Sequence, residues 1–313
     1  MARKLETLIL ASRRATENQE YTETAGIQDE EFIQYFNDGQ EEIHTILNSS
    51  FPHILMKIKE ISLTAGQEGY SIPSDVFMGT RIDAIEFTQS GNAQNYYPLK
   101  KGSIKERLSG IQTDPSFYIR NGTQILLQPK PQSSGSKIRV TYQRSIPKLD
   151  VQRATVESVT LDTGAKTITS LVLDDAVLMD TAALLEENFI TILDKNGQIK
   201  MQGIPISAIS STGVVTVDAG FVYEDGETIE AGDAVCRGTF SSNFSELPDL
   251  CEKYLLEYTN TRILMRDSST DADALGQVLL KVQTTLQTAF AEPDNDPDYV
   301  PVLDGQYLGW DSF

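Results

Sequence analysis

The sequence predicts an α+β protein, in which a helical layer from both chain termini packs with an antiparallel β region. An inserted small all-β barrel or sandwich domain and an extended C-terminal arm complete it. Three observations predict this class. Apolar residues recur at helical spacing near both ends of the 313-residue chain. Short alternating runs separated by turn residues fill the middle. The last 22 residues carry six acids, three prolines and no base. The expected divisions are 1–150 (N-terminal helices and β region), 151–240 (inserted domain), 241–291 (C-terminal helices) and 292–313 (arm).

The N-terminal part predicts two helices. Residues 3–17 place Leu5, Leu8 and Ile9 on one face, which Leu10 is expected to widen. A second helix opens at the acids of residues 29–31, since negative charge near a helix N-terminus opposes the macrodipole. Its apolar positions share helical spacing: Phe32, Ile33, Phe36, Ile43, Ile46 and Leu47. Pro52 is expected to end or redirect it.

From residue 57 to residue 150 the pattern is that of β-strands. The runs KIKEISLTAGQ, GYSIPSD, RIDAIEFT, YYPLK, SFYIRNG, QILLQPKP and KIRVTYQRS are separated by turn residues. Polar and apolar residues alternate in the last two, as in half-buried strands. Asn121-Gly122 is a strong hairpin signal between two runs. The region is therefore predicted to be antiparallel.

Residues 155–238 form a second β block. Its expected strands are VESVTL, TSLVLD, NFITILD, IKMQGI, GVVTVD and AVCRG, with glycine turns at 162–164, 195–197, 211–213 and 225–226. The block carries 4 Lys/Arg against 14 Asp/Glu, whereas residues 64–150 carry 11 against 7. Its acidity and strand spacing predict a self-contained insertion, joined through residues 147–150 and 238–243.

Helical spacing returns after Ser245. Pro248 stands near the first turn, and Leu250, Tyr254, Leu255 and Tyr258 provide one apolar face. A final helix places its apolar positions three or four apart: Leu275, Leu279, Val282, Leu286 and Phe290. The stripes at the two chain ends must be buried, and each is the most economical partner of the other.

The arm holds the chain's single tryptophan. Its anchors are Tyr299, Tyr307, Leu308, Trp310 and Phe313. Aromatic residues dominate interface energetics, so docking on a partner is the favoured interpretation, and packing against its own domain is the alternative.

Several segments together, in order, resemble a known family. The motif residues are Tyr70, Ile72, Pro73, Asp75, Tyr97, Pro98, Leu99, Tyr118, Asn121, Gly122, Pro129, Pro131, Tyr142, Arg144 and Leu149. This succession, over residues 27–150, is similar to that of the head-to-tail adaptor proteins of tailed bacteriophages. The block at 155–238 departs from a minimal adaptor.

The resemblance implies a structural protein without catalysis or cofactor. Adaptors of this kind assemble as a ring, usually of twelve copies, beneath the portal protein. They bridge the portal to tail, nozzle or neck proteins and line the DNA exit channel, where DNA passes without specific binding. The implied location is the head–tail junction of the virion, with the host cytoplasm before assembly. The arm is expected to reach along the portal, and the inserted block decorates the ring or receives fibres.

Candidate chemistry is sparse. The two histidines, His44 and His53, have no metal-binding context and are expected on a polar helix face. No G-x-S-x-G or P-loop occurs, and Gly135-Ser136-Lys137 lacks the adjacency that a phosphate loop needs. Residues 267–273 resemble a calcium loop only faintly, and capping of the last helix by Asp271 or Ser269 explains them. For the acids of residues 294–298 a solvated linker is favoured over weak cation binding. Cys236 and Cys251 are expected to be free, partly buried thiols.

The basic cluster Lys100, Lys101, Lys105 and Arg107 interrupts an otherwise acidic chain, whose formal net charge is −19. A contact with an acidic protein surface, including the arm's own aspartates, is favoured over DNA because the overall acidity opposes binding to phosphates. No stretch is apolar enough to predict a membrane span. Two rival functions remain open: another tail or baseplate component whose β block binds fibres or receptor, and a cell-wall hydrolase.

Overall fold

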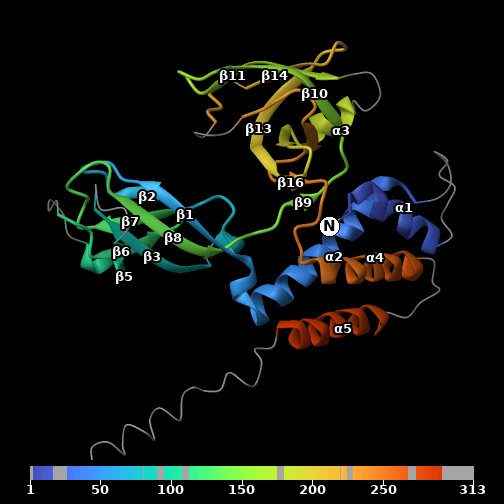
Figure 1. Ribbon diagram of the computed structural model, residues 1–313, viewed down its shortest axis with the longest axis horizontal. Helices are drawn as coiled ribbons and strands as arrows, with labels where there is room; N and C mark the ends of the chain where they lie inside the picture. Colours follow the sequence, from blue (N-terminus) through green and yellow to red (C-terminus); the bar gives the residue numbers. More distant parts are fainter. Residues whose placement is uncertain are drawn as a thin grey trace, which may run out of the picture. The chain divides into compact units, whose positions relative to one another are not determined.

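The computed structural model describes residues 3–16, 27–79, 81–89, 95–107, 113–174, 180–218, 220–223, 228–266 and 273–290 (Figure 1). The fold is mixed α+β, as predicted. Contacts divide the chain into two units. One comprises Met1–Ile46 together with Pro147–Phe313, and the other comprises Leu47–Ile146.

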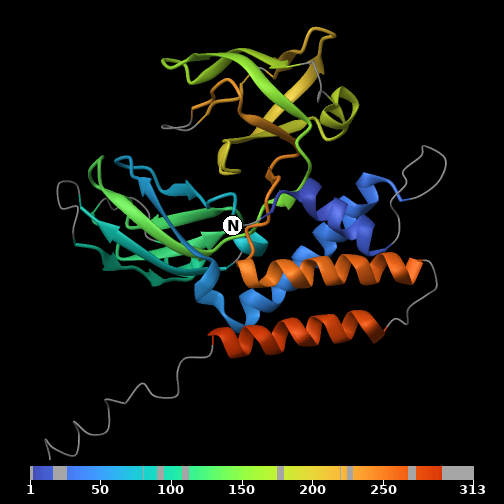
Figure 2. The ribbon, with the colours of Figure 1, turned by 45° about the vertical axis from the view of Figure 1, so that its right-hand side comes forward.

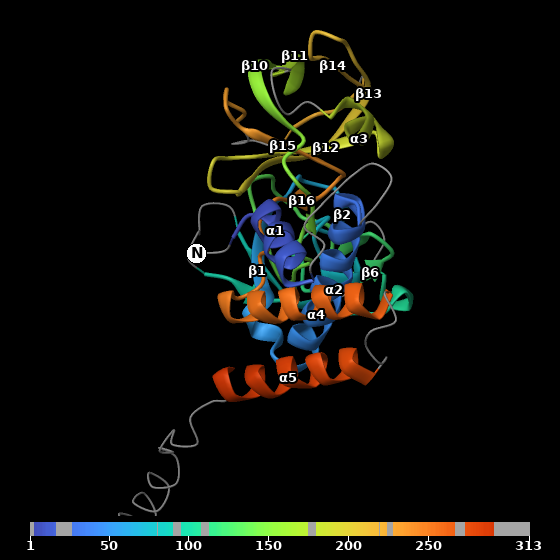
Figure 3. The ribbon, with the colours of Figure 1, turned by 90° about the vertical axis from the view of Figure 1, so that its right-hand side faces the viewer.

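The helical layer of the first unit combines both ends of the chain. It contains α1 (Leu5–Ala15), the first part of α2 (Asp29–Ser50), α4 (Glu252–Arg266) and α5 (Asp273–Phe290). Helix α4 contacts both α1 and α5 (Figures 2 and 3). Gly39 of α2 permits a close approach to α4, because a Cβ there would lie 2.7 Å from the Tyr258 ring. The expected layer is thus confirmed.

Two details of the helical prediction are wrong. Leu5, Leu8 and Ile9 are buried, but Leu10 is 55% exposed. Leu10 lies two positions after Leu8, which turns its side chain about 200° away on an α-helix. His44, expected on a polar face, is only 4% exposed. It follows Ile43 directly and precedes Leu47 by three positions, so it falls within the buried stripe.

The unit Leu47–Ile146 contains two four-stranded sheets. One has the order β1-β8-β3-β4, with β1 Met56–Ser62, β8 Lys137–Gln143, β3 Ile82–Thr88 and β4 Tyr97–Pro98. The other has the order β2-β7-β6-β5, with β2 Gly69–Ser71, β7 Gln124–Gln128, β6 Phe117–Asn121 and β5 Lys100–Lys101. Alternate residues of both sheets share one core, which includes Tyr70, Ile85, Phe87, Ile125, Leu127, Ile138, Val140 and Tyr142.

The predicted hairpin turn is present, but the prediction of purely antiparallel pairing has one exception. β6 and β7 form the expected hairpin, and Gly122 takes φ +58° in its turn. β5, however, pairs parallel to β6, with Lys100 opposite Phe117. Residues 102–116, which include the 3₁₀ turn Ile104–Glu106, separate the two strands. A connection of this length permits a parallel return, which a tight hairpin does not.

A partly buried hydrogen bond lies beside the core of this unit. The Tyr142 hydroxyl donates to Asp75 Oδ1 at 2.7 Å, and Lys57 Nζ lies 2.7 Å from Asp75 Oδ2. Burial opposes the ionised form of Asp75, but the hydrogen bonds from Lys57 and Tyr142 outweigh it and lower its pKa. The Asp75 carboxylate is therefore held ionised inside the motif segment.

Replacing Tyr142 by Phe is expected to lower the free energy of unfolding by about 1.5 kcal/mol at pH 7, because a hydrogen bond to a carboxylate is lost. The pKa of Asp75 is lower in the folded protein than its ordinary value. Ionised Asp75 therefore stabilises the folded protein fully above the ordinary pKa, and this stabilisation is lost as the pH falls through the folded pKa. The difference between variant and wild type should therefore shrink toward pH 3 in urea titrations. Tyr118→Phe is the control, since the Tyr118 hydroxyl makes no hydrogen bond within the described residues. A pH-independent difference would contradict the assignment.

The inserted block is a closed six-stranded barrel, as predicted. Its order is β10-β11-β14-β13-β12-β15. The strands are β10 Ala154–Asp162, β11 Thr167–Asp174, β12 Phe189–Leu193, β13 Ile199–Ile209, β14 Val214–Val217 and β15 Ala234–Arg237. A short helix, α3 (Thr181–Glu186), was not anticipated. The Asp180 side chain caps it by accepting from the Ala183 N–H.

The two connectors of the barrel are themselves paired. β9 (Lys148–Leu149) and β16 (Ser241–Ser242) lie parallel, with Ser241 opposite Lys148. Asn37 of α2 accepts from the Leu149 N–H at 2.7 Å and donates to the Leu149 carbonyl at 2.8 Å. The chain therefore enters and leaves the barrel through a hydrogen-bonded ladder attached to α2.

The barrel junction and candidate assembly surfaces

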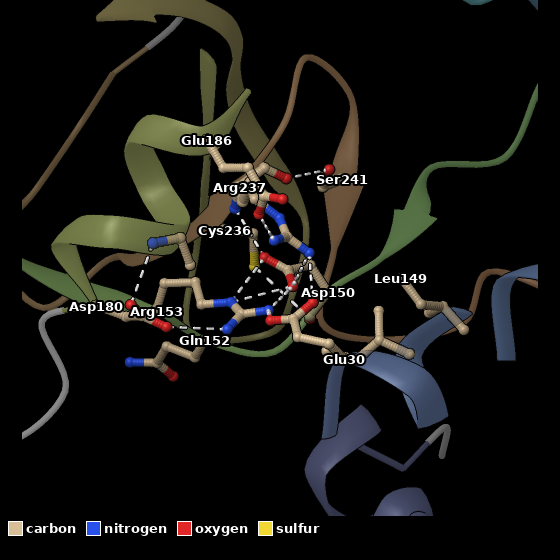
Figure 4. Close-up of polar contacts among 12 residues, drawn as sticks. Glu30, Leu149, Asp150, Gln152, Arg153, Asp180, Glu186, Cys236, Arg237 and Ser241 are labelled. Atoms are coloured by element: carbon tan, nitrogen blue, oxygen red, sulfur yellow. Dashed lines mark hydrogen bonds and ion pairs between the residues drawn. The ribbon is translucent and has the colours of Figure 1, made fainter. Parts of the chain in front are cut away.

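A charged cluster lies where the chain enters and leaves the barrel (Figure 4). Asp150 follows β9, Arg153 precedes β10, and Arg237 ends β15. Arg153 contacts Asp150 at 2.8 Å, Asp180 at 3.0 Å and Glu30 of α2 at 2.5 Å. Each of its two terminal nitrogens therefore has a carboxylate partner.

Arg237 completes the cluster from the other connector. It contacts Glu30 at 2.8 Å and Glu186 of α3 at 2.5 Å, and its backbone N–H donates to Asp150 at 2.8 Å. Glu30 thus bridges the two arginines (Figure 4). This arrangement joins α2, both connectors and α3, and we call it the barrel junction: Glu30, Asp150, Arg153, Asp180, Glu186 and Arg237.

Burial and pairing act differently on the two central acids. Asp150 is 3% exposed, and burial raises its pKa even though Arg153 and Arg237 favour its charged form. Burial also opposes ionisation of Glu30, but hydrogen bonds from Arg237 and Arg153 outweigh it and lower the pKa of Glu30. Burial disfavours the charged form of Arg153, yet its carboxylate partners raise its pKa. Since each charge of the barrel junction has a partner, the cluster is suited to holding elements together.

The two cysteines are free, as predicted, but buried more completely than expected. Burial raises the pKa of the Cys236 thiol well above its ordinary value, and it raises the pKa of Cys251 to about 12. Both thiols therefore stay protonated at neutral pH, which makes them poor nucleophiles.

The predicted basic cluster lies on and after β5, and all four of its side chains are exposed. Arg107 pairs with Glu68, with 2.7 Å between Nε and Oε1. The hydrogen bond from Arg107 lowers the pKa of Glu68 against the opposing effect of burial. Lys100, Lys101 and Lys105 make no ion pair with any residue that the structure describes. We call these three residues the lysine surface.

The family-motif residues divide between the core and the surface. Those in the core are Tyr70, Pro73, Tyr118, Pro129 and Tyr142, while Asp75 accepts the Tyr142 hydrogen bond and Gly122 forms the hairpin turn. The Tyr70 hydroxyl accepts from the Thr64 N–H and donates to its carbonyl. Tyr97 is instead 55% exposed, and Pro98 is exposed beside it. Most of the motif therefore serves folding.

Helix α5 presents an exposed face with little charge. Leu280 is 63% exposed, and its neighbours on this face are Gln277, Gln283, Thr284, Gln287 and Thr288. The hydroxyls of Thr284 and Thr288 donate to carbonyls four residues back, at 2.8 and 2.9 Å. Lys281, the cation nearby, pairs with Glu257 of α4 at 2.5 Å. Charge depletion of this kind is typical of interface cores.

Sequence reasoning missed the barrel junction and the α5 face. Asp150 and Arg153 are three residues apart, but Glu30 lies 123 residues from Arg153, and no local signal links them. Leu280 lies outside the apolar repeat that predicted the helix, and that repeat assigns it no role. The arm anchors Tyr299, Tyr307, Leu308, Trp310 and Phe313 lie outside the described residues, as do residues 267–272 and 294–298.

Two negative findings apply to the described part of the chain. It contains no group of three or more His, Cys, Asp or Glu side chains that could hold a metal ion. None of its helices is both long and apolar enough to cross a membrane.

The mixed α+β fold and its helical layer fit the class that the motif resembles, the head-to-tail adaptors of phages. A family model described as "SU10 adaptor protein" matches residues 4–187, which is more than half of the chain. The chain therefore belongs to the SU10 adaptor protein family. The match extends beyond the motif segments into the first two strands of the barrel and α3. A comparison with curated proteins finds no significant match.

Proposed function

We propose that this phage adaptor assembles as a ring of twelve copies beneath the portal, links the portal to tail proteins, and lines the DNA exit channel. The family match carries the proposal, because it covers the N-terminal helices and the whole unit Leu47–Ile146. The protein acts by binding its neighbours and needs no catalytic group or cofactor. Its place is the head–tail junction of the virion.

The exposed surfaces support self-association. The uncharged face of α5, with Leu280 at its centre, can bury apolar area without desolvating charges. A head-to-tail ring requires two different surfaces on each copy that complement each other. A basic β unit and an acidic remainder supply such a difference within one chain.

The charge balance suits a channel through which DNA moves. A net charge of −19 opposes retention of phosphates, so DNA can pass without specific binding. Arg153 and Arg237 of the barrel junction and Arg107 are paired with carboxylates, so these three arginines are not free to hold phosphates.

The C-terminal arm is proposed to dock on the portal. Removing residues 292–313 should lower portal affinity by at least about a hundredfold, because a buried aromatic anchor contributes about 2 kcal/mol or more to an interface and the arm carries several. The measurement is binding of purified portal rings to the full-length and shortened chains. Thermal unfolding of both chains should show the same transition, since the described helices and strands end at Phe290.

A matched variant separates the aromatic anchors from the charge of the arm. Tyr307→Ala, Trp310→Ala and Phe313→Ala combined keep all six acids and should reproduce most of the loss. An unchanged portal affinity in both variants would remove the arm from the portal contact. Absence of rings by electron microscopy, with and without portal, would contradict the proposed function itself.

A further inference from the structure

The lysine surface carries charge that the described chain does not neutralise. Lys100 and Lys101 form β5, the edge strand of the order β2-β7-β6-β5. Lys105 follows in the 3₁₀ turn, where a capping box with Ser103 occupies the carboxylate of Glu106. Arg107 is engaged by Glu68. Three exposed cations therefore remain within six residues.

The same short segment also offers apolar contacts. Tyr97 and Ile104, on either side of β5 in sequence, are each 55% exposed. Gly102 holds this segment close to β6, because a Cβ there would lie 2.4 Å from the Phe117 ring. An extended peptide with both acidic and apolar residues fits such a surface better than double-stranded DNA, because the surface offers both cations and apolar side chains.

The chain itself contains a segment of that chemistry. Residues 292–298 carry four acids, Glu292, Asp294, Asp296 and Asp298, with two prolines and no base, and Tyr299 and Val300 follow directly. Segment and surface are opposite in charge, and each has apolar residues beside its charges. Two lysine surfaces would repel each other, so a symmetric contact between like surfaces is disfavoured. A head-to-tail contact pairs unlike surfaces and repeats around a ring.

We propose that the lysine surface of one copy binds the acidic segment 292–298 of a second copy. This inference rests on the proposed ring and names one of its contacts. It leaves the arm's distal anchors, Tyr307, Trp310 and Phe313, available to the portal. DNA is the less favoured occupant, because three cations in a chain of net charge −19 release few counterions.

Zero-length cross-linking tests the contact directly. Full-length chains grown in ¹⁴N and ¹⁵N media are mixed, assembled with portal rings and treated with a water-soluble carbodiimide, which joins a lysine amine to a touching carboxylate. Mass spectrometry should find peptides that link residues 100–105 to residues 292–298 with one light and one heavy partner. Only uniformly labelled cross-links would place the contact within a single copy and overturn the proposal, as would no cross-link between these residues in assembled rings.

Charge reversal provides a second, independent readout. A surface variant carries Lys100→Glu, Lys101→Glu and Lys105→Glu, and a segment variant carries Asp294→Lys, Asp296→Lys and Asp298→Lys. Each alone should associate at least about tenfold more weakly by sedimentation, with portal present, because attraction becomes repulsion. In a mixture, the acidic segment of the surface variant can bind the unchanged lysine surface of the segment variant. The mixture should therefore recover association. Failure of the mixture to recover would contradict a contact between copies.

Matched controls distinguish this contact from general charge effects and from misfolding. Lys101→Glu should weaken association more than Lys195→Glu, an exposed lysine of the barrel that undergoes the same change. The segment variant leaves every described residue intact, so its loss of association does not reflect unfolding of the β unit. Binding of a short DNA duplex that depends on the three lysines, without the cross-links, would assign the surface to DNA. Rings that form normally in every variant would overturn this inference and leave the proposed function standing.

Discussion

Replacing Arg153 by Met is expected to lower the free energy of unfolding by about 3 kcal/mol or more at pH 7. Met preserves much of the side-chain volume but removes the charge that faces Asp150, Asp180 and Glu30. Breaking a buried ion pair costs about 3–5 kcal/mol, because the remaining charge stays buried without compensation. Urea or thermal unfolding of the full-length chain measures the loss.

The pH dependence of this loss identifies its cause. Burial already raises the pKa of Asp150, so protons bind it more tightly in the folded than in the unfolded state. Lowering the pH toward 4 should therefore reduce the deficit of the variant. Asp150→Asn combined with Arg153→Met should recover part of the stability, because the uncompensated charge is gone.

A surface arginine provides the control. Arg266 contacts Glu31 at 2.7 Å, but its side chain is 46% exposed, so Arg266→Met should cost less than about 1 kcal/mol. Equal effects at Arg153 and Arg266 would show that the barrel junction contributes no more than an ordinary exposed ion pair.

Replacing Gly213 by Ala is expected to destabilise the barrel by about 3 kcal/mol. Gly213 has φ +78° in the turn between β13 and β14, and a Cβ would lie 2.1 Å from the Leu173 carbonyl oxygen. The left-handed conformation costs an L-residue about 1–2 kcal/mol, and forcing a methyl group into occupied space costs about 1–3 kcal/mol more. The clash is with backbone, which cannot move without disturbing the pairing of β11 with β14.

Gly122→Ala isolates the conformational part of that cost. Gly122 has φ +58°, and no atom lies within 4 Å of the position that a methyl group would take, so its substitution should cost only about 1 kcal/mol. Near-ultraviolet circular dichroism and thermal unfolding compare the two variants. A Gly213 variant no less stable than the Gly122 variant would show that the turn relaxes without cost.

Local pattern explains why so much of the fold was predictable. The stripe of Leu5, Leu8 and Ile9 and the alternation in β8 are short-range periodicities, and they recur because one face of each element must leave water. The glycine turns likewise report a local backbone requirement. The two errors have different causes. Leu10 lies off the apolar stripe of its own helix and remains exposed, whereas β5 pairs parallel to β6, which the long connection between the two strands permits.

The α+β class, the barrel, the helices at both ends and the adaptor motif can all be read from the order of the amino acids, because each depends on residues close together in the chain. Folding in three dimensions was needed to establish that Glu30 joins Arg153 and Arg237, and that Leu280 faces outward. It also separated the paired Arg107 from the three residues of the lysine surface. Ion pairing and burial depend on contacts between residues that are distant in the sequence. Whether a charged side chain is paired, or an apolar side chain is buried, is therefore decided only when the chain folds.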